Sequence, residues 1–292
     1  MEIAVWYPSN APAASQPIGL LDQIVANEAA VAGSRLPLVV MSHGNGGSLS
    51  GHVDTALALA RAGFVVAALT HTGDNYHDQS RAVDLPNRPR QLKLLTDYML
   101  QTWRDRAAID ANEVGAFGFS AGGFTVLTAI GGEADLSKTR PHCLAHPTYY
   151  DCTLVAQHRD LALPLETKAV AWVHDPRIKA AIIAAPAMGF AFGREGLQGV
   201  RAPVQLWRAE LDHILPHPDY AEAVRTALPT PPDYHLVPGA DHFDFLAPCT
   251  ERLRAAAPFI CISPAGFNRA KFHEAFNREA VTFFTAKLTP AR

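Results

Sequence analysis

The feature of the sequence that limits the fold most is a serine between two glycines, in the segment GFSAG at residues 118–122. An apolar run at 114–119 precedes this serine, Ser120, and apolar residues at helical spacing follow it. This order predicts a β-strand, a sharp turn and an α-helix, with the serine at the apex. The flanking glycines leave room for so tight a turn. The segment therefore predicts an exposed serine hydroxyl at a helix N-terminus; a small-residue turn that packs a helix on a sheet is the alternative.

The rest of the chain predicts that this strand belongs to a parallel sheet. Continuous apolar runs are typical of strands buried on both faces, and they occur at 36–41, 64–69, 178–184 and 203–207, with shorter β-like segments at 2–7 and 234–237. Helical patterns lie between or after them, at 53–62, 90–103, 218–228 and 269–288. The alternation predicts an α/β fold, with a mostly parallel central sheet and helices on both faces.

The chain is predicted to form a single domain over residues 1–292 with one insertion. Its 48% hydrophobic and 18% charged residues supply a sizeable core. The region 133–175 interrupts the alternation with charges, prolines, histidines and cysteines, and it lacks a long regular pattern. It is interpreted as an insertion at the carboxyl edge of the sheet, either a lid or pocket wall or a packed surface excursion.

Composition and motifs exclude several function classes. The net charge is -3 with no basic stripe, which argues against nucleic acid as a partner. The longest uncharged stretch, 180–193, is too short to span a bilayer. The glycine-rich segment 43–47 matches neither a P-loop nor a dinucleotide fingerprint, so no cofactor is predicted. The histidines and aspartates at 71–78 are interpreted as loop or pocket-rim residues, and no metal is predicted. The sequence leaves the oligomeric state open.

The cysteines form two local pairs, Cys143 with Cys152 and Cys249 with Cys261. Neither spacing matches a zinc ribbon or a redox motif. Two local disulfides and four reduced thiols both remain open. The N-terminus shows no signal peptide, so the sequence as given predicts a cytoplasmic protein. Paired cysteines together with a preceding leader would instead indicate the periplasm or secretion.

Polar residues that follow the strands complete a nucleophile site around Ser120. A serine needs a base within hydrogen-bond reach, and the base needs a group that orients it. Glu210 and Asp212 follow the strand at 203–207, and His242 follows the last strand. Serine, acid and histidine is the chain order expected on this scaffold, so Ser120, Asp212 and His242 are predicted as the catalytic residues, with Glu210 as the alternative acid. The neighbours of the histidine are predicted to be caps or turn residues: Asp241 and Asp244.

Backbone donors for an oxyanion are predicted at two strand ends. The N–H of Ala121 follows the nucleophile directly, and Asn45 lies in the small-residue loop after the strand at 36–41. Residues near these positions are predicted to line the substrate pocket: His43, Phe119, Met188 and Phe190. Core packing is the alternative for the aromatic ones.

The motifs SHGNGG, HTGDN, GFSAGG, AAPAMG, ELDHILP and GADHFDF together resemble the α/β-hydrolase family. Within it, the chain resembles predicted dienelactone hydrolases and bacterial relatives of platelet-activating-factor acetylhydrolase. The resemblance implies Ser120 as nucleophile, His242 as base and an acid after a late strand. Dienelactone hydrolases carry a cysteine where this chain has Ser120. The acetylhydrolases carry their acid in the loop where this chain has Ala185 and Pro186, which favours Asp212.

These features predict a serine carboxylesterase that hydrolyses neutral esters of short to medium acyl chain through an acyl-enzyme. Its partner would be a small-molecule ester, or a polymeric ester such as a polyester if the insertion leaves the cleft open. The alternatives are a non-catalytic binding protein with the hydrolase fold, and a peptidase, amidase or lactonase with the same catalytic residues.

Overall fold

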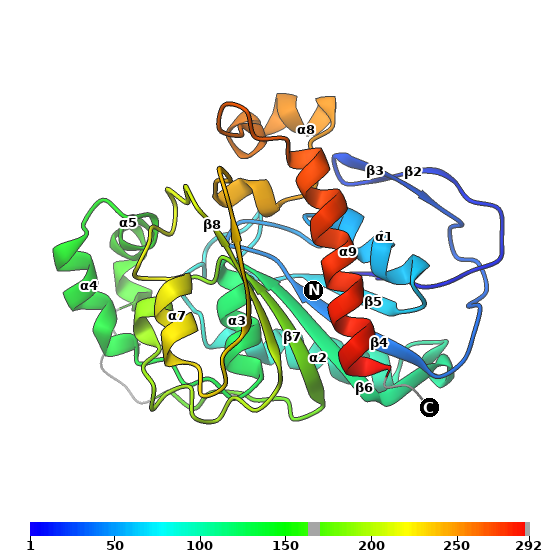
Figure 1. Cartoon of the computed structure of the whole chain (residues 1–292), viewed down its shortest axis with the longest axis horizontal. Coiled ribbons are helices and arrows are strands. Elements are labelled where there is room, and N and C mark those ends of the chain that lie inside the picture. The colour runs from blue at the N-terminus through cyan, green and yellow to red at the C-terminus, as the bar shows by residue number, and fades with distance from the viewer. Residues whose placement is uncertain (163–169, 290–292) are drawn as a thin grey trace.

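The computed structural model describes residues 1–162 and 170–289 (Figure 1). A seven-stranded sheet has the order β1-β5-β4-β6-β7-β8-β9, and β1 is antiparallel to β5 whereas the other neighbours pair in parallel. The sheet strands are β1 Glu2–Trp6, β4 Leu36–Ser42, β5 Val65–Thr70, β6 Ile109–Phe119, β7 Ile178–Ala184, β8 Val204–Ala209 and β9 Asp233–Val237. The α/β fold predicted from the sequence is confirmed.

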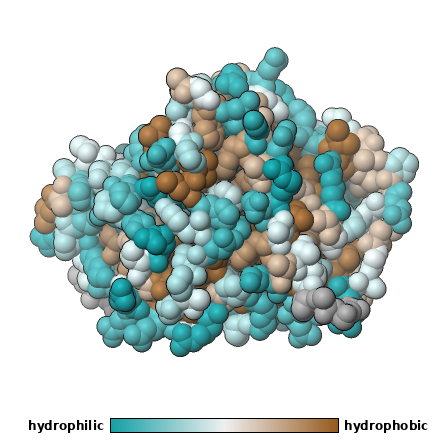
Figure 2. Space-filling model, viewed as in Figure 1, coloured by the Kyte–Doolittle hydropathy of each residue, from teal (hydrophilic) through white to brown (hydrophobic). Residues whose placement is uncertain are grey.

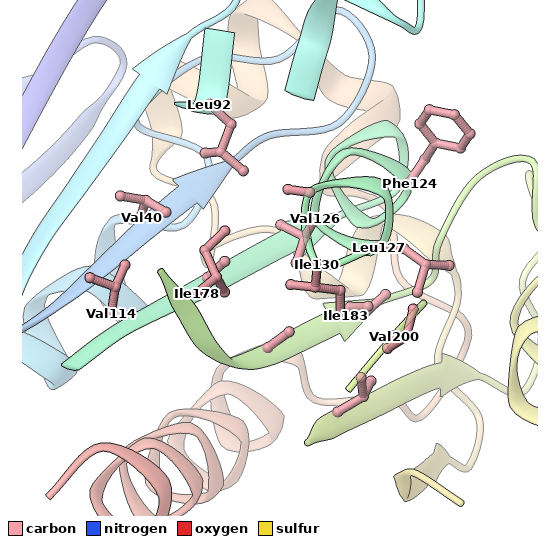
Figure 3. Packing of buried hydrophobic residues seen from close by; sticks show 14 of the residues in the cluster. Val40, Leu92, Val114, Phe124, Val126, Leu127, Ile130, Ile178, Ile183 and Val200 are labelled. Carbon is pink, nitrogen blue, oxygen red and sulfur yellow. The ribbon is translucent and has the colours of Figure 1, made fainter. Parts of the chain in front are cut away.

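Helices cover both faces of the sheet and enclose two apolar layers. They are α1 Val53–Arg61, α2 Asn87–Gln101, α3 Ala121–Ala129, α4 Thr139–Ala145, α5 Tyr150–Gln157, α7 Ala221–Ala227, α8 Glu251–Ala256 and α9 Arg269–Leu288. One layer lies under α2, α3 and α7, and it includes Val40 of β4, Leu92 of α2 and Phe124 of α3 (Figure 3). The other lies under α1 and α9, which contact each other, and includes Val39 and Phe276. The side chains of successive β4 residues thus point to opposite faces of the sheet, as expected for a strand buried on both sides.

Several element boundaries differ from the sequence prediction. The segment 9–32, for which the sequence predicts no element, contains the hairpin β2 Ala14–Ile18 and β3 Leu21–Val25, whose largely exposed residues give no clean alternation. Helix α2 begins at Asn87, before the predicted position 90, because Pro89 fits a first helical turn where no N–H is needed. Strand β6 begins five residues early, at Ile109, because residues 110–113 between this buried isoleucine and the continuous buried run at 114–119 are not buried and interrupt the apolar pattern.

The predicted insertion at 133–175 contains η2 Leu136–Lys138, α4 and α5; its residues 163–169 lie outside the described part of the chain. A disulfide between Cys143 and Cys152 joins α4 to α5. A second disulfide, between Cys249 and Cys261, joins the segment before α8 to the 3-10 turn η5 Pro258–Cys261. Both cysteine pairs suggested by the sequence are therefore bonded.

Two segments outside the sheet surround the carboxyl ends of its strands. The insertion lies at one end of the molecule and the α8 region lies above the strands (Figure 1). Figure 2 shows a largely polar face with apolar surface between α5 and α8. Within residues 1–162 and 170–289, no helix is both long and apolar enough to cross a membrane.

Candidate active site

Ser120 stands at the junction of β6 and α3 in a backbone conformation that side chains rarely adopt, with φ 57° and ψ -119°. The turn brings the backbone of Gly122 against Gly118, and the end of β4 against Gly122. A Cβ on Gly118 would lie 2.1 Å from the carbonyl oxygen of Gly122, and a Cβ on Gly122 would lie 1.9 Å from that of Ser42. Only glycine fits at these positions, so the sequence signal around Ser120 has a direct steric cause.

The structure brings Ser120, His242 and Asp212 together from three strand ends. The Oγ of Ser120 lies 3.1 Å from Nε2 of His242, and Nδ1 of His242 lies 2.8 Å from Oδ2 of Asp212. All of these residues are at least nine-tenths buried. Because a carboxylate only accepts hydrogen bonds, Nδ1 of His242 carries the proton and Nε2 is left to accept from the serine hydroxyl.

Asp212, rather than the alternative acid Glu210, faces the histidine. The other carboxylate oxygen of Asp212 accepts the backbone N–H groups of Ile214 and Leu215, at 3.1 and 2.7 Å, which fixes the side chain in its own loop. The carboxylate of Glu210 instead accepts the N–H of Gly239 at 2.8 Å. The two acids therefore have different structural roles, although they are only two positions apart in the sequence.

A capped 3-10 turn, η4 His242–Phe245, holds the histidine. Asp241 caps this turn, and the buried Asp244 accepts the N–H of Asp241 at 2.9 Å, as expected for turn residues. Arg269 of α9 donates its Nε–H to Asp244 at 3.0 Å. The ring of His273, also in α9, contacts the carbonyl oxygen of Asp244 through Nε2 at 2.9 Å. The long C-terminal helix thus positions His242 from behind.

The loop after β4 is fixed by a buried ion pair. Asp74 accepts the side-chain N–H of Asn45 at 2.6 Å and the backbone N–H of Gly46 at 2.9 Å. Its second oxygen pairs with Arg88, which also donates to the carbonyl oxygen of His43. Both charged side chains of the pair are almost fully buried. Removal of either partner would leave an uncompensated buried charge, so the pair fixes the loop geometry strongly.

Two backbone N–H groups beside Ser120 are available as hydrogen-bond donors. Among the described residues, neither Asn45 nor Ala121 donates its N–H to a backbone carbonyl. The side-chain oxygen of Asn45 accepts the hydroxyl of Tyr150, so the side chain of Asn45 is held from both ends. Asn45 and Ala121, the two predicted oxyanion donors, both border the same cavity as Ser120.

Sequence reasoning missed the groups that support this loop. The sequence predicts only a loop or pocket-rim position for Asp74, and it assigns no role to Arg88 or Tyr150. The HTGDN motif could have indicated the role of Asp74, because an aspartate in a turn after a strand often accepts hydrogen bonds from nearby backbone N–H groups. Arg88 lies in the first turn of α2, and nothing in the sequence indicates that its guanidinium is buried.

His43 and His71 are buried neutral imidazoles under the loop. Nδ1 of His43 donates to the carbonyl oxygen of Gly44 at 2.6 Å, and its Nε2 accepts the N–H of His71 at 3.0 Å. Burial, reinforced by the nearby charge of Arg88, lowers the pKa of His43 from 6.5 to about 3 and that of His71 well below its usual range. The histidines therefore add no charge to the site near neutral pH.

Two cavities meet at Ser120. A narrow cavity of about 60 Å³ is mostly apolar, and its wall includes Leu136, Leu154, Val155, Met188 and Leu215. A wide cavity of about 850 Å³ is bordered by His242, Phe243, Leu246 and Phe259, among others. Both include Asn45, Ser120 and Tyr150 in their walls. The serine hydroxyl thus lies at the passage between a small apolar space and a large one.

The predicted pocket residues divide between these spaces and the core. Met188 borders the narrow cavity, whereas His43 and Phe119 border the wide one. The ring of Phe119 packs against His242 with centroids 4.8 Å apart. Phe190 is not among the residues that border these two cavities, and it stacks on His142 at a centroid distance of 3.7 Å.

The polar residues at 71–78 do not gather as metal ligands. His71 contacts Ser42 and Gln91 at 2.8 and 3.2 Å, and Asp74 is engaged by Arg88. His77 is exposed on the surface. Through Asp74, this loop therefore fixes the position of Asn45 and Gly46 in the loop after β4.

The strand order, with helices on both faces of a mostly parallel sheet, is that of the α/β-hydrolase fold. Residues 19–91, from the β2–β3 turn into α2, match the family described as "Platelet-activating factor acetylhydrolase, isoform II". A ferulic acid esterase from Streptomyces cinnamoneus superposes with a TM-score of 0.63 at 20% identity, over 99% of this chain and 83% of that chain. At this identity the match establishes the fold. No curated protein sequence matches the chain.

Proposed function

We propose that the protein is a serine carboxylesterase acting on neutral esters of short to medium acyl chain. The observation that carries the proposal is the continuous contact from Ser120 through His242 to Asp212, with distances of 3.1 and 2.8 Å. A serine hydroxyl is a weak nucleophile until an adjacent base accepts its proton. The tautomer that Asp212 imposes on His242 leaves the required lone pair on Nε2.

In the proposed reaction, Nε2 of His242 takes the Ser120 proton while Oγ attacks the ester carbonyl carbon. The carbonyl oxygen gains negative charge, and the N–H groups of Asn45 and Ala121 donate to it. Collapse of this intermediate breaks the bond to the alcohol, which receives its proton from His242. Water then attacks the acyl-serine by the same route and releases the acid.

The two cavities suggest which part of the ester lies where. His242 protonates the leaving alcohol, so the alcohol must lie on the side of His242, which borders the wide cavity. The acyl group then extends into the narrow cavity beside Ala121 and Met188. We therefore propose esters with a compact apolar acyl group and a bulkier alcohol, and the wide cavity also suits the end of a polymeric ester.

The lining of the cavities supports uncharged substrates. Neither cavity has a lysine or arginine in its wall within the described part of the chain, so no clamp for a carboxylate or phosphate faces Ser120. The likeness to a ferulic acid esterase and the match to the acetylhydrolase family agree with ester chemistry on this scaffold. They leave the particular ester to be measured.

The direct test is Ser120→Ala, assayed with p-nitrophenyl butyrate beside the wild type and the exposed-serine control Ser80→Ala. We expect kcat to fall by about four orders of magnitude or more in Ser120→Ala and to stay unchanged in Ser80→Ala. Labelling by a fluorophosphonate probe should follow the same pattern. A wild-type protein that neither labels nor hydrolyses any ester would favour the non-catalytic binding protein.

A panel of esters tests the substrate class. One series lengthens the acyl group from acetyl to dodecanoyl, a second enlarges the alcohol, and a third replaces the ester by the matching amide. We expect kcat/KM to fall with acyl length, to tolerate bulky alcohols and to be lowest for amides. Equal rates on ester and amide would instead assign a peptidase or amidase.

A further inference from the structure

A cluster of metal-binding side chains lies where the insertion meets the main domain, away from the serine. His142 belongs to α4 and His146 caps its C-terminus, where the N–H of His146 still donates to the carbonyl oxygen of His142 at 2.9 Å. The helical turn therefore continues between them, and residues four apart lie on the same face of a helix. Asp219, from the segment before α7, faces them across the junction, and Figure 1 shows α4 beside α7.

The three side chains offer one ligand atom each within 4.8 Å of one another. The Nε2 of His146 lies 3.7 Å from a carboxylate oxygen of Asp219, which is too long for a hydrogen bond. Tetrahedral ligands at about 2.0–2.1 Å from a zinc ion lie about 3.3 Å apart, so small side-chain rotations would close the set. The side chains of His146 and Asp219 are 35% and 28% exposed, which leaves them free to rotate and open to an ion from solvent.

A hydrogen-bonded relay behind His142 supplies the outer partner that metal-binding histidines usually have. The hydroxyl of Tyr220 donates its one proton to Asp151, at 2.8–2.9 Å from the two carboxylate oxygens. Its oxygen therefore accepts from Nε2 of His142, 3.2 Å away. This leaves Nδ1 of His142 without a proton and able to bind a metal. Phe190 stacks on the same imidazole and holds the plane of the ring.

We propose that His142, His146 and Asp219 bind one zinc-type divalent ion that ties the insertion to the main domain. Two imidazoles and a carboxylate suit Zn²⁺, Co²⁺ and their neighbours, whereas Ca²⁺ and Mg²⁺ prefer oxygen-only sites. With three protein ligands, water completes the tetrahedron. Because the same insertion supplies Leu154 and Val155 to the narrow cavity, the ion would stiffen that cavity wall.

The test is calorimetric titration of Zn²⁺ into the full, disulfide-bonded chain after removal of metals with a chelator, together with visible spectroscopy of the Co²⁺ form. We expect one ion per chain, a rise in Tm on addition of Zn²⁺, and the intense visible absorption of four-coordinate Co²⁺. His146→Ala and Asp219→Asn should each weaken binding at least about tenfold, as should the outer-shell variant Tyr220→Phe.

His158→Ala is the matched control, because this histidine also belongs to the insertion but lies outside the cluster. The His158→Ala variant should bind Zn²⁺ with the same affinity as the wild type. His146 and Asp219 are partly exposed, so their variants are expected to fold, which circular dichroism verifies. The proposal is overturned if the wild type binds no Zn²⁺, or if His146→Ala and Asp219→Asn bind it as tightly as His158→Ala does.

Discussion

At the scale of single residues, the orientation of Asn45 depends on the buried carboxylate of Asp74, which borders neither cavity beside Ser120. Asp74 and Tyr150 hold the amide of Asn45 from opposite ends, and Arg88 balances the charge of Asp74. An oxyanion donor is effective only if it is oriented before charge develops, because reorientation during the reaction costs free energy. In the proposed mechanism, these residues therefore act on the rate through the backbone of Asn45.

Tyr150→Phe isolates one of these supports. We expect kcat to fall about threefold to tenfold with little change in KM, since one hydrogen bond that orients the loop is lost. The measurement is steady-state hydrolysis of p-nitrophenyl butyrate. Tyr149→Phe is the control, because it removes the neighbouring hydroxyl and leaves the Tyr150–Asn45 bond in place. Equal effects of both variants would argue against an orienting role for Tyr150.

Gly122→Ala tests the steric argument for the serine turn. The added Cβ would lie 1.9 Å from the carbonyl oxygen of Ser42, so backbone must shift. We expect a loss of about 3 kcal/mol or more in the free energy of unfolding, together with loss of esterase activity. Urea unfolding checks this, with Gly193→Ala as the control, because a Cβ there meets only the flexible end of Lys138 at 3.4 Å. Normal stability of Gly122→Ala would contradict the geometry.

The sequence predicts those residues of the candidate site that directly follow a strand. Ser120, Asp212 and His242 each follow a recognisable apolar run, and parallel strands bring their carboxyl ends to one edge of the sheet. Arg88 could not be predicted in the same way. Its burial depends on where α2 lies against α3, where its Nε–H donates to Thr125, a packing relation between residues 37 positions apart.

At the scale of elements, each disulfide lies beside a different cavity. The Cys143–Cys152 bond joins α4 to α5, and α5 supplies Leu154 and Val155 to the narrow cavity. The Cys249–Cys261 bond lies next to α8 and η5, which supply Ala256 and Phe259 to the wide cavity. In the proposed arrangement of the ester, one bond supports the acyl side and the other the alcohol side.

Serine variants of each pair separate these effects. We expect the double variant of Cys143 and Cys152 to lose about 2–3 kcal/mol of stability, from the loop that the bond closes, and to accept longer acyl groups. The double variant of Cys249 and Cys261 should lose a similar amount but change the preference for the alcohol. Chemical unfolding and the ester panel measure both effects. The assignment fails if both double variants alter acyl and alcohol preference alike.

Elements were predictable where the core determines their pattern. The buried strand β7 has the predicted bounds, and so does the long helix α9, because apolar residues recur wherever each one faces the core. The β2–β3 hairpin escaped prediction because its residues are largely exposed and its pairing rests on backbone hydrogen bonds. Similarly, Phe190 lies after a strand end as predicted, but its direction depends on a stacking partner, His142, contributed by the insertion.

At the scale of the whole molecule, the fold buries several imidazoles in neutral form. Burial is the main cause of the lowered pKa in each: about 3 for His43, about 4 for His52 and well below 6.5 for His71. In the unfolded chain these groups take up protons below about pH 6.5. Between that pH and the folded-state pKa, the unfolded state binds more protons, so stability rises with pH and falls on acidification.

His52 offers a test that leaves the candidate active site intact. Its ring contacts Phe117 and Phe119, at centroid distances of 4.8 and 5.3 Å. His52→Leu therefore places an apolar side chain in apolar surroundings. We expect little change in stability near neutral pH. Between about pH 6.5 and 4, the free energy of unfolding of His52→Leu should fall less steeply than that of the wild type, by about 1.4 kcal/mol per pH unit.

Urea unfolding at a series of pH values measures the two slopes. The control is His77→Leu, which removes an exposed imidazole and should leave the wild-type slope unchanged. Parallel curves for His52→Leu and the wild type would mean that His52 charges in the folded state as readily as in the unfolded chain. Since burial is the largest cause of its lowered pKa, such a result would require water to reach the space between α1 and the central sheet.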